Sequence, residues 1–246
     1  MKININFKII RILCFVIVFG FGLRGTEGQI NVFKSFVKSE WLPLYDSLHL
    51  NYSHNKKFEK DFELQSLIAL SYYPELKDVP ITFEYHDIKT TMEVRPEYLS
   101  AFKNHNRRYI IFIDDKVRNN EGLLLSEVSF NAQIGVIGHE LAHIMDFQHR
   151  SVTSLLGLGI DYVFMKNHAK YERSIDEYAI KRGLGWQELE FADFMQNKSK
   201  ATAKYKRFKQ INYLSASEIE EEIAKMKVYS SLEPPRLVGN PIMEKQ

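Results

Sequence analysis

Cysteine is almost absent from the sequence, and so are the residues that mark linkers and disordered regions. The one cysteine, Cys14, lies in an apolar N-terminal run, so the rest of the chain has neither a disulfide nor a cysteine metal ligand. Seven prolines and twelve glycines among 246 residues are too few for a linker-rich protein, and no repeat or low-complexity tract is present. Length and composition therefore favour one globular domain.

The sequence also lacks a large excess of charge of either sign. Its formal net charge is +2, and residues 1–28 alone carry +3, so the remainder has a net charge of −1. No general attraction to nucleic acid is expected. A basic run, "NKSKATAKYKRFKQ" at residues 197–210, is most often a solvated helix face, although it could make weak contact with a membrane surface.

The N-terminal apolar run, from Ile12 to Leu23, is short for a membrane span. It has twelve residues, follows a basic start and is followed by small and polar residues, which is typical of a signal peptide. We therefore predict a signal peptide over residues 1–28 and a single mature domain over 29–246. The protein is expected to be exported to the periplasm or the cell exterior; retention of the segment as an N-terminal anchor is the less favoured alternative.

The apolar pattern predicts an α+β domain that is mainly helical. Residues 30–75 have helical spacing, whereas segments 79–88, 90–99 and 109–113 are rich in β-branched and aromatic residues and predict a small sheet. Helices are expected over about 129–148, from 152, over about 170–182 and from 186. Ser217 with Glu220 three positions later indicates a capping box for a further helix. A small sheet thus precedes the histidine-rich segment, and helices follow it.

The histidine-rich segment is "VIGHELAHIMDFQH", residues 136–149. His139 and His143 are four residues apart, which places them on one helix face, one turn apart, where both imidazoles can bind one zinc ion. Glu140, on the adjoining face, can take a proton from a zinc-bound water without being a ligand.

Small residues run beside this motif. Gly135, Gly138 and Ala142 form a stripe on the same predicted helix. Because each glycine costs a helix about 1 kcal/mol relative to alanine, we expect another backbone to pack closely there. Histidines and a glutamate in an apolar helix need partners, which favours a metal site over coincidence.

Two residues compete for the third ligand. His149 follows His143 at the spacing of a metzincin third histidine, but Asp146 occupies the position where that pattern needs a glycine. Glu172 lies with Asp176 and Ala179 on one face of a later helix. Glu172 could bind the metal while Asp176, one turn on, accepts the free N–H of a ligand histidine; we favour Glu172.

The segments "GHELAH" and "ERSIDEYAIKRG" resemble the gluzincin pattern HExxH…ExxxD, and more narrowly the CAAX-prenyl-protease-like metallopeptidases and their soluble exported relatives. The resemblance covers about residues 109–185; Ile175 replaces an alanine usual in that family. The multi-span membrane core is missing, so prenylated substrates are not implied. The resemblance implies a zincin-like fold and a zinc endopeptidase, with a strand such as 109–113 lining a cleft for extended peptide.

The predicted function is therefore an exported zinc metallopeptidase that hydrolyses peptide bonds in a peptide or protein substrate, through a zinc-bound water activated by Glu140. The alternatives are a zinc-binding, non-hydrolytic surface or assembly protein, and a metzincin-like peptidase that uses His149. Four residues are weak candidates for stabilising the oxyanion: His168, Tyr171, Tyr178 and Tyr213.

Overall fold

The computed structural model describes residues 31–116, 122–163 and 167–230. The predicted signal peptide lies outside these residues. Within the described ranges, no helix combines the length and the apolar character needed to cross a membrane.

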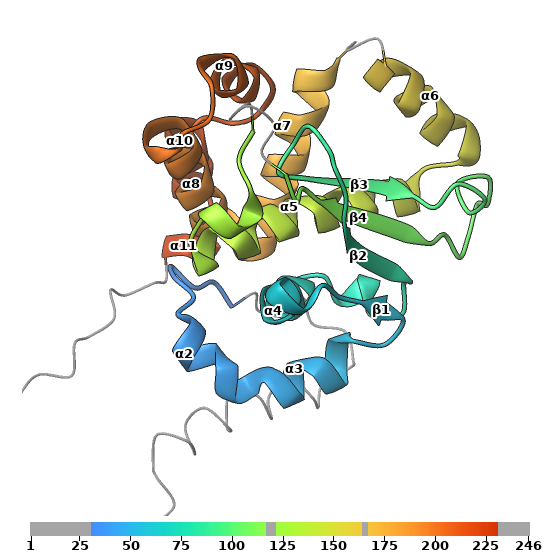
Figure 1. The fold of residues 1–246 in the computed structure, drawn as a ribbon, viewed down its shortest axis with the longest axis horizontal. Helices are drawn as coiled ribbons and strands as arrows, with labels where there is room; N and C mark the ends of the chain where they lie inside the picture. Colours follow the sequence, from blue (N-terminus) through green and yellow to red (C-terminus); the bar gives the residue numbers. More distant parts are fainter. Residues whose placement is uncertain (1–30, 117–121, 164–166, 231–246) are drawn as a thin grey trace, which may run out of the picture.

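A four-stranded sheet forms the β part of the α+β fold, as the sequence predicts (Figure 1). Its strands are β1 (Lys56–Lys57), β2 (Ile81–Tyr85), β3 (Met92–Pro96) and β4 (Tyr109–Ile113), in the order β1-β2-β4-β3. β4 pairs in parallel with β2 and antiparallel with β3. The short strand β1 was not predicted, because two lysines give no apolar alternation.

Helices make up most of the remainder. They are α2 (Lys38–Trp41), α3 (Tyr45–Tyr52), α4 (Glu63–Leu70), α5 (Phe130–His149), α6 (Val152–Val163), α7 (His168–Ala179), α8 (Gly185–Asp193), α9 (Ala203–Asn212), α10 (Ala216–Lys225) and α11 (Lys227–Ser230). Short turns η1 (Leu42–Leu44), η2 (Lys60–Phe62), η3 (Pro74–Leu76) and η4 (Leu125–Glu127) and wide turns η5 (Ile180–Leu184) and η6 (Phe194–Lys198) connect or extend them. The helices predicted around residues 130–148, 170–182 and 186 onward are confirmed.

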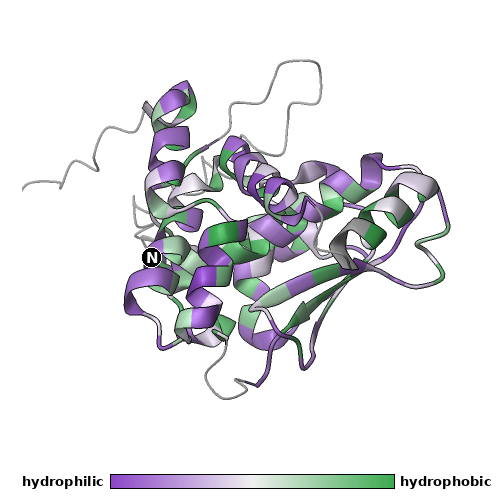
Figure 2. Ribbon diagram, turned by 90° about the horizontal axis from the view of Figure 1, so that it is seen from above, coloured by the Kyte–Doolittle hydropathy of each residue, from purple (hydrophilic) through white to green (hydrophobic). Residues whose placement is uncertain are grey.

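Helix α5 is the central element of the molecule. Ser129 caps it by accepting a hydrogen bond from the Ala132 N–H at 3.0 Å. The helix lies against the sheet and contacts α4, α7 and α8 (Figure 1). Ile137, Leu141 and Ile144 are fully buried, and hydrophobic segments gather in the middle of the molecule (Figure 2). The polar residues of α5 are therefore held in an apolar, rigid setting.

The small-residue stripe of α5 does receive another backbone: Gly135 faces the backbone of α8, and Gly138 faces the side chain of Leu184 in η5. A Cβ at Gly135 would lie 2.6 Å from the backbone carbonyl carbon of Gln187, and one at Gly138 would lie 2.3 Å from Leu184 Cδ1. No side chain fits at Gly135 without moving a backbone. The glycine at this position thus sets how closely α8 approaches the histidine motif.

Two sequence-based expectations need correction. Strand β4 is central and hydrogen-bonded on both sides, so the edge available to an extended peptide belongs to β3. The capping box of α10 is formed by Ser215 and Glu218, two residues earlier than the predicted pair Ser217 and Glu220. The helix expected from residue 152 is confirmed as α6, which packs on the surface with Leu155 buried and with Leu156 and Ile160 exposed.

Candidate metal centre

Three buried side chains converge between helices α5 and α7. His139 Nε2 lies 3.1 Å from His143 Nε2 and 3.2 Å from Glu172 Oε2, and His143 Nε2 lies 3.5 Å from the same carboxylate oxygen. The helical spacing of four residues brings the two imidazoles together, and the packing of α7 on α5 adds the carboxylate. These residues, with Asp176, form a buried group that could bind a metal ion.

Asp176 fixes the orientation of His139. His139 Nδ1 lies 2.8 Å from Asp176 Oδ1, and the Leu214 N–H donates to Asp176 Oδ2 at 2.8 Å. A carboxylate can only accept, so Nδ1 carries a proton toward Asp176; in the neutral ring this leaves the lone pair on Nε2, which faces His143 and Glu172. This is the arrangement expected of a histidine that binds a metal through Nε2.

A second chain of hydrogen bonds does the same for His143. The Tyr171 hydroxyl donates to Asp146 Oδ2 at 2.8 Å, and that oxygen also accepts from Arg150 Nε at 2.6 Å. With its proton given to Asp146, the Tyr171 oxygen accepts from His143 Nδ1, 3.2 Å away. His143 Nε2 therefore also carries a lone pair.

The three converging atoms fit one tetrahedral metal ion. Ligand atoms about 2.0–2.1 Å from such an ion lie about 3.3–3.4 Å apart, close to the 3.1–3.5 Å found here. Two imidazole lone pairs and a carboxylate oxygen repel one another unless a cation or proton lies between them. The donor set therefore fits zinc, which accepts nitrogen and oxygen ligands.

The pKa values of His139 and Glu172, two of the candidate ligands, are shifted in opposite directions, each toward its charged form. Burial alone would lower the pKa of His139, but hydrogen bonds to the Asp176 and Glu172 carboxylates outweigh burial and raise that pKa well above its ordinary range. Burial alone would raise the pKa of Glu172, but His143 and His139 hold it well below its ordinary range.

A second trio, His139, Asp176 and Glu188, also lies within metal-binding distance of one another. Both Asp176 oxygens already accept N–H groups, and the 2.8 Å separation from His139 Nδ1 is that of a hydrogen bond. Asp176 is thus better explained as the partner that orients His139 than as a ligand.

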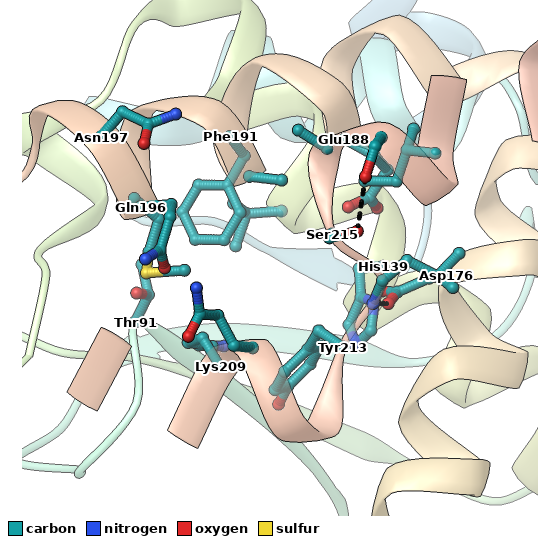
Figure 3. A pocket seen from close by; sticks show the side chains of 18 of the residues that line it. Thr91, His139, Asp176, Glu188, Phe191, Gln196, Asn197, Lys209, Tyr213 and Ser215 are labelled. Atoms are coloured by element: carbon teal, nitrogen blue, oxygen red, sulfur yellow. Dashed lines mark hydrogen bonds and ion pairs between the residues drawn. The ribbon is translucent and has the colours of Figure 1, made fainter. Parts of the chain in front are cut away.

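A pocket of about 360 Å³ opens beside His139 (Figure 3). Glu140 also lines it. Burial raises the pKa of Glu140, partly offset by the nearby His143 and His139, which brings this carboxylate closer to the proton affinity of a general base at neutral pH. Burial likewise raises the pKa of Tyr213, another lining residue, well above its ordinary value, so its hydroxyl keeps its proton.

The other three residues that were named as weak candidates for stabilising the oxyanion lie outside the pocket lining. His168 lies against the outer side of Glu172, with Nε2 3.7 Å from Oε1, and its Nδ1 lies 2.9 Å from Asn212 Oδ1. The Tyr171 hydroxyl is occupied with Asp146, as described above. The Tyr178 hydroxyl accepts from Arg182, which is bound to Glu75. Only Tyr213 of the four lines the pocket.

His149 is not brought to the three converging side chains. Helix α5 continues without a break through Asp146 to His149, whereas the metzincin pattern needs the chain to leave the helix before that point. His149 is exposed, and its Nδ1 lies 2.6 Å from the carbonyl oxygen of Met145.

Sequence reasoning missed three residues near the site. The sequence analysis considered Asp146 only as the residue that occupies the position of the metzincin glycine. Its place three residues after His143, however, puts it on the same helix face. Glu188 lines the pocket, and its buried Oε1 has no hydrogen-bond partner among the described residues. Lys209, one of six basic residues in the run at 197–210, was expected in solvent but is buried and lines the pocket.

No protein-family model, curated protein or solved structure matches the chain.

Proposed function

We propose that this protein is a zinc-dependent metallopeptidase of gluzincin type. His139, His143 and Glu172 would hold the metal, Asp176 would orient His139, and Glu140 would act as general base. The observation that carries the proposal is the convergence of two imidazole lone pairs and one carboxylate oxygen within 3.1–3.5 Å, beside a pocket that Glu140 also lines.

A zinc ion held there would supply Lewis acidity, which polarises a peptide carbonyl and acidifies water. Glu140 takes a proton from the attacking water as the water oxygen bonds to the carbonyl carbon. The same carboxyl then gives that proton to the leaving nitrogen as the C–N bond breaks. Because burial raises the pKa of Glu140, the carboxylate is a stronger base than an exposed glutamate and a suitable acid afterwards.

Tyr213 is the best candidate for stabilising the oxyanion. It lines the pocket together with Glu140, and its ring centroid lies 5.7 Å from that of His139. Its hydroxyl keeps its proton, so it can donate a hydrogen bond to negative charge that develops on the carbonyl oxygen.

Strand β3 offers a surface for the substrate backbone. It is an edge strand of the described sheet, and Thr91 and Met92 at its start line the pocket. An extended peptide can add to such an edge through main-chain hydrogen bonds, which would lead its chain toward Glu140.

The test combines metal analysis with peptide hydrolysis. The purified protein is expected to bind one zinc per chain and to cleave members of a peptide library, and a chelator should stop cleavage. Glu140→Gln should abolish cleavage while zinc remains bound; the matched control is Glu220→Gln, an exposed glutamate on α10.

Two results would contradict the proposal at different points. If the purified protein holds no stoichiometric zinc after reconstitution, the proposed metal centre is refuted. Zinc binding with no cleavage by either the wild-type protein or the Glu140→Gln variant favours the non-hydrolytic alternative.

A further inference from the structure

Lys209 departs from the other basic residues of its segment. It lies in the last turn of α9, and only 8% of its surface is exposed. Tyr205 and Asn212, four residues before and three after it, are buried on the same face. By contrast, Lys204 on the same helix is exposed. Helix α9 therefore turns one cation of the run toward the interior.

Aromatic rings surround the Lys209 ammonium. Its Nζ lies 3.8 Å from the ring centroid of Tyr213, 5.9 Å from that of Tyr205 and 6.0 Å from that of Phe191. Cation–π attraction and the helix C-terminus both favour a positive charge here. In the described part of the chain, no hydrogen bond or ion pair joins this ammonium to a carboxylate. Glu140 and Glu188 act on this charge only from a distance, and a buried cation that no carboxylate contacts directly is stabilised further when a negative group binds beside it.

Lys209 lines the pocket, so a negatively charged group bound there would lie next to its ammonium. Lys209 and Tyr213 lie along one side of the pocket, Phe191 and Glu188 lie opposite, and His139 marks one end (Figure 3). The Lys209 charge is close enough to lower the pKa of Glu140 and of Glu188, although burial, the larger effect, raises both. The ammonium thus faces the space next to the general base.

Apolar side chains complete the walls of this space. Val136, Phe191, Met195, Leu214 and Ile219 all line it. An apolar cavity strengthens a single charge–charge contact, because little water competes for either group.

We propose that this pocket is a substrate subsite that accepts a carboxylate, with Lys209 as the group that recognises it. The inference rests on the proposed function and narrows its substrate class: peptides with a carboxylate next to the scissile bond and an apolar group beside it. A free C-terminus and the side chain of Asp or Glu supply the same carboxylate chemistry, and the experiment separates these two sources.

Binding to a non-hydrolysing protein tests the subsite. Zinc-loaded Glu140→Gln protein is titrated calorimetrically with three peptides: N-acetyl-Leu-Phe with a free carboxylate, the same peptide as its amide, and N-acetyl-Leu-Glu amide. We expect one of the two acidic peptides to bind roughly 10- to 100-fold more tightly than the neutral amide, as for a charge-assisted hydrogen bond. A preference for the first acidic peptide indicates a free C-terminus, and for the second an acidic side chain.

Substitutions of Lys209 show whether this residue causes the preference for the acidic peptide. On the same Glu140→Gln background, Lys209→Met should remove it without weakening the neutral peptide, whereas Lys209→Arg and the control Lys204→Met should keep it. If Lys209→Met does not fold, Lys209→Gln replaces it. Equal binding of all three peptides overturns the proposal, and so does a preference that survives Lys209→Met, since the metal would then account for it.

The binding readout is independent of turnover. A protein that cleaves peptides but shows no carboxylate preference refutes the subsite alone. A protein that binds the acidic peptide through Lys209 but cleaves nothing refutes the peptidase alone.

Discussion

His139 Nε2 and His143 Nε2 lie 3.1 Å apart on successive turns of α5. Two neutral imidazoles cannot hydrogen-bond through these atoms when both carry their protons on Nδ1, as Asp176 and Tyr171 require. The short separation therefore has a physical explanation only if a positive charge lies between the rings. A metal ion bound by both rings would supply that charge, and so would a proton between them.

The ligand set predicts a graded loss of zinc. Glu172→Ala removes a proposed ligand and should abolish stoichiometric zinc binding. Asp176→Ala leaves all three ligands but frees His139, and should weaken zinc affinity by about 10- to 100-fold. His149→Ala, the matched control on the exposed end of α5, should bind zinc like the wild type. Competition with a chelator measures all three affinities; zinc loss in His149→Ala with retention in Glu172→Ala would reverse the assignment.

Zinc binding should release a proton and weaken in acid. The pKa of His139 in the metal-free fold is raised well above 6.5, because its bonds to Asp176 and Glu172 outweigh burial. The protonated form therefore stabilises the metal-free fold below the ordinary pKa, and this contribution is lost as pH rises through the raised pKa. Zinc must displace the proton, so its apparent affinity should fall about tenfold per pH unit below that raised pKa.

Calorimetric zinc titrations in two buffers of different ionisation enthalpy measure the released protons. About one proton per zinc is expected near neutral pH. The Asp176→Asn variant should release fewer protons per zinc, because it lacks the carboxylate whose hydrogen bond does most to raise the His139 pKa. Affinity that does not vary between about pH 6 and pH 8 would be inconsistent with this coupling.

Tyr213→Phe should slow catalysis more than it weakens substrate binding. The substitution keeps the ring beside His139 and Lys209 and removes only the hydroxyl. Loss of one oxyanion donor lowers kcat by about 100-fold or more, and KM should change little. Tyr178→Phe is the control, since the hydroxyl of that residue contacts Arg182 and not the pocket. Equal kcat in Tyr213→Phe and wild type would assign the oxyanion to another donor.

Gly135→Ala should destabilise the fold. The new methyl group would lie 2.6 Å from the Gln187 backbone, so α8 must move. Overpacking of this kind costs about 1–3 kcal/mol, and the better helix propensity of alanine offsets about 1 kcal/mol of it.

Gly157→Ala on α6 is the matched control for that substitution. No atom lies within 4 Å of its new methyl group, so only the propensity gain remains. Urea unfolding should show opposite signs for the two variants. A Gly135→Ala protein as stable as the wild type would mean that the α5–α8 contact yields easily.

The sequence by itself determined the parts of this protein that helix and strand periodicity encode. The four-residue spacing of His139 and His143 requires one shared face, and the same spacing joins Glu172 to Asp176. Three strand segments with β-branched and aromatic residues gave the sheet its position before the motif. These relationships lie within single elements, so the local pattern is sufficient to predict them.

Only the tertiary structure decided what meets across elements. Periodicity shows that Gly135 lies on a small-residue stripe, but the packing of distant segments makes α8 its neighbour. The contact of Tyr171 with Asp146 joins two helices, as does the position of Lys209 beside Tyr213 and Phe191. The inward turn of Lys209 could not be predicted, because a lysine in a basic run is favoured in water unless rings from other segments enclose it.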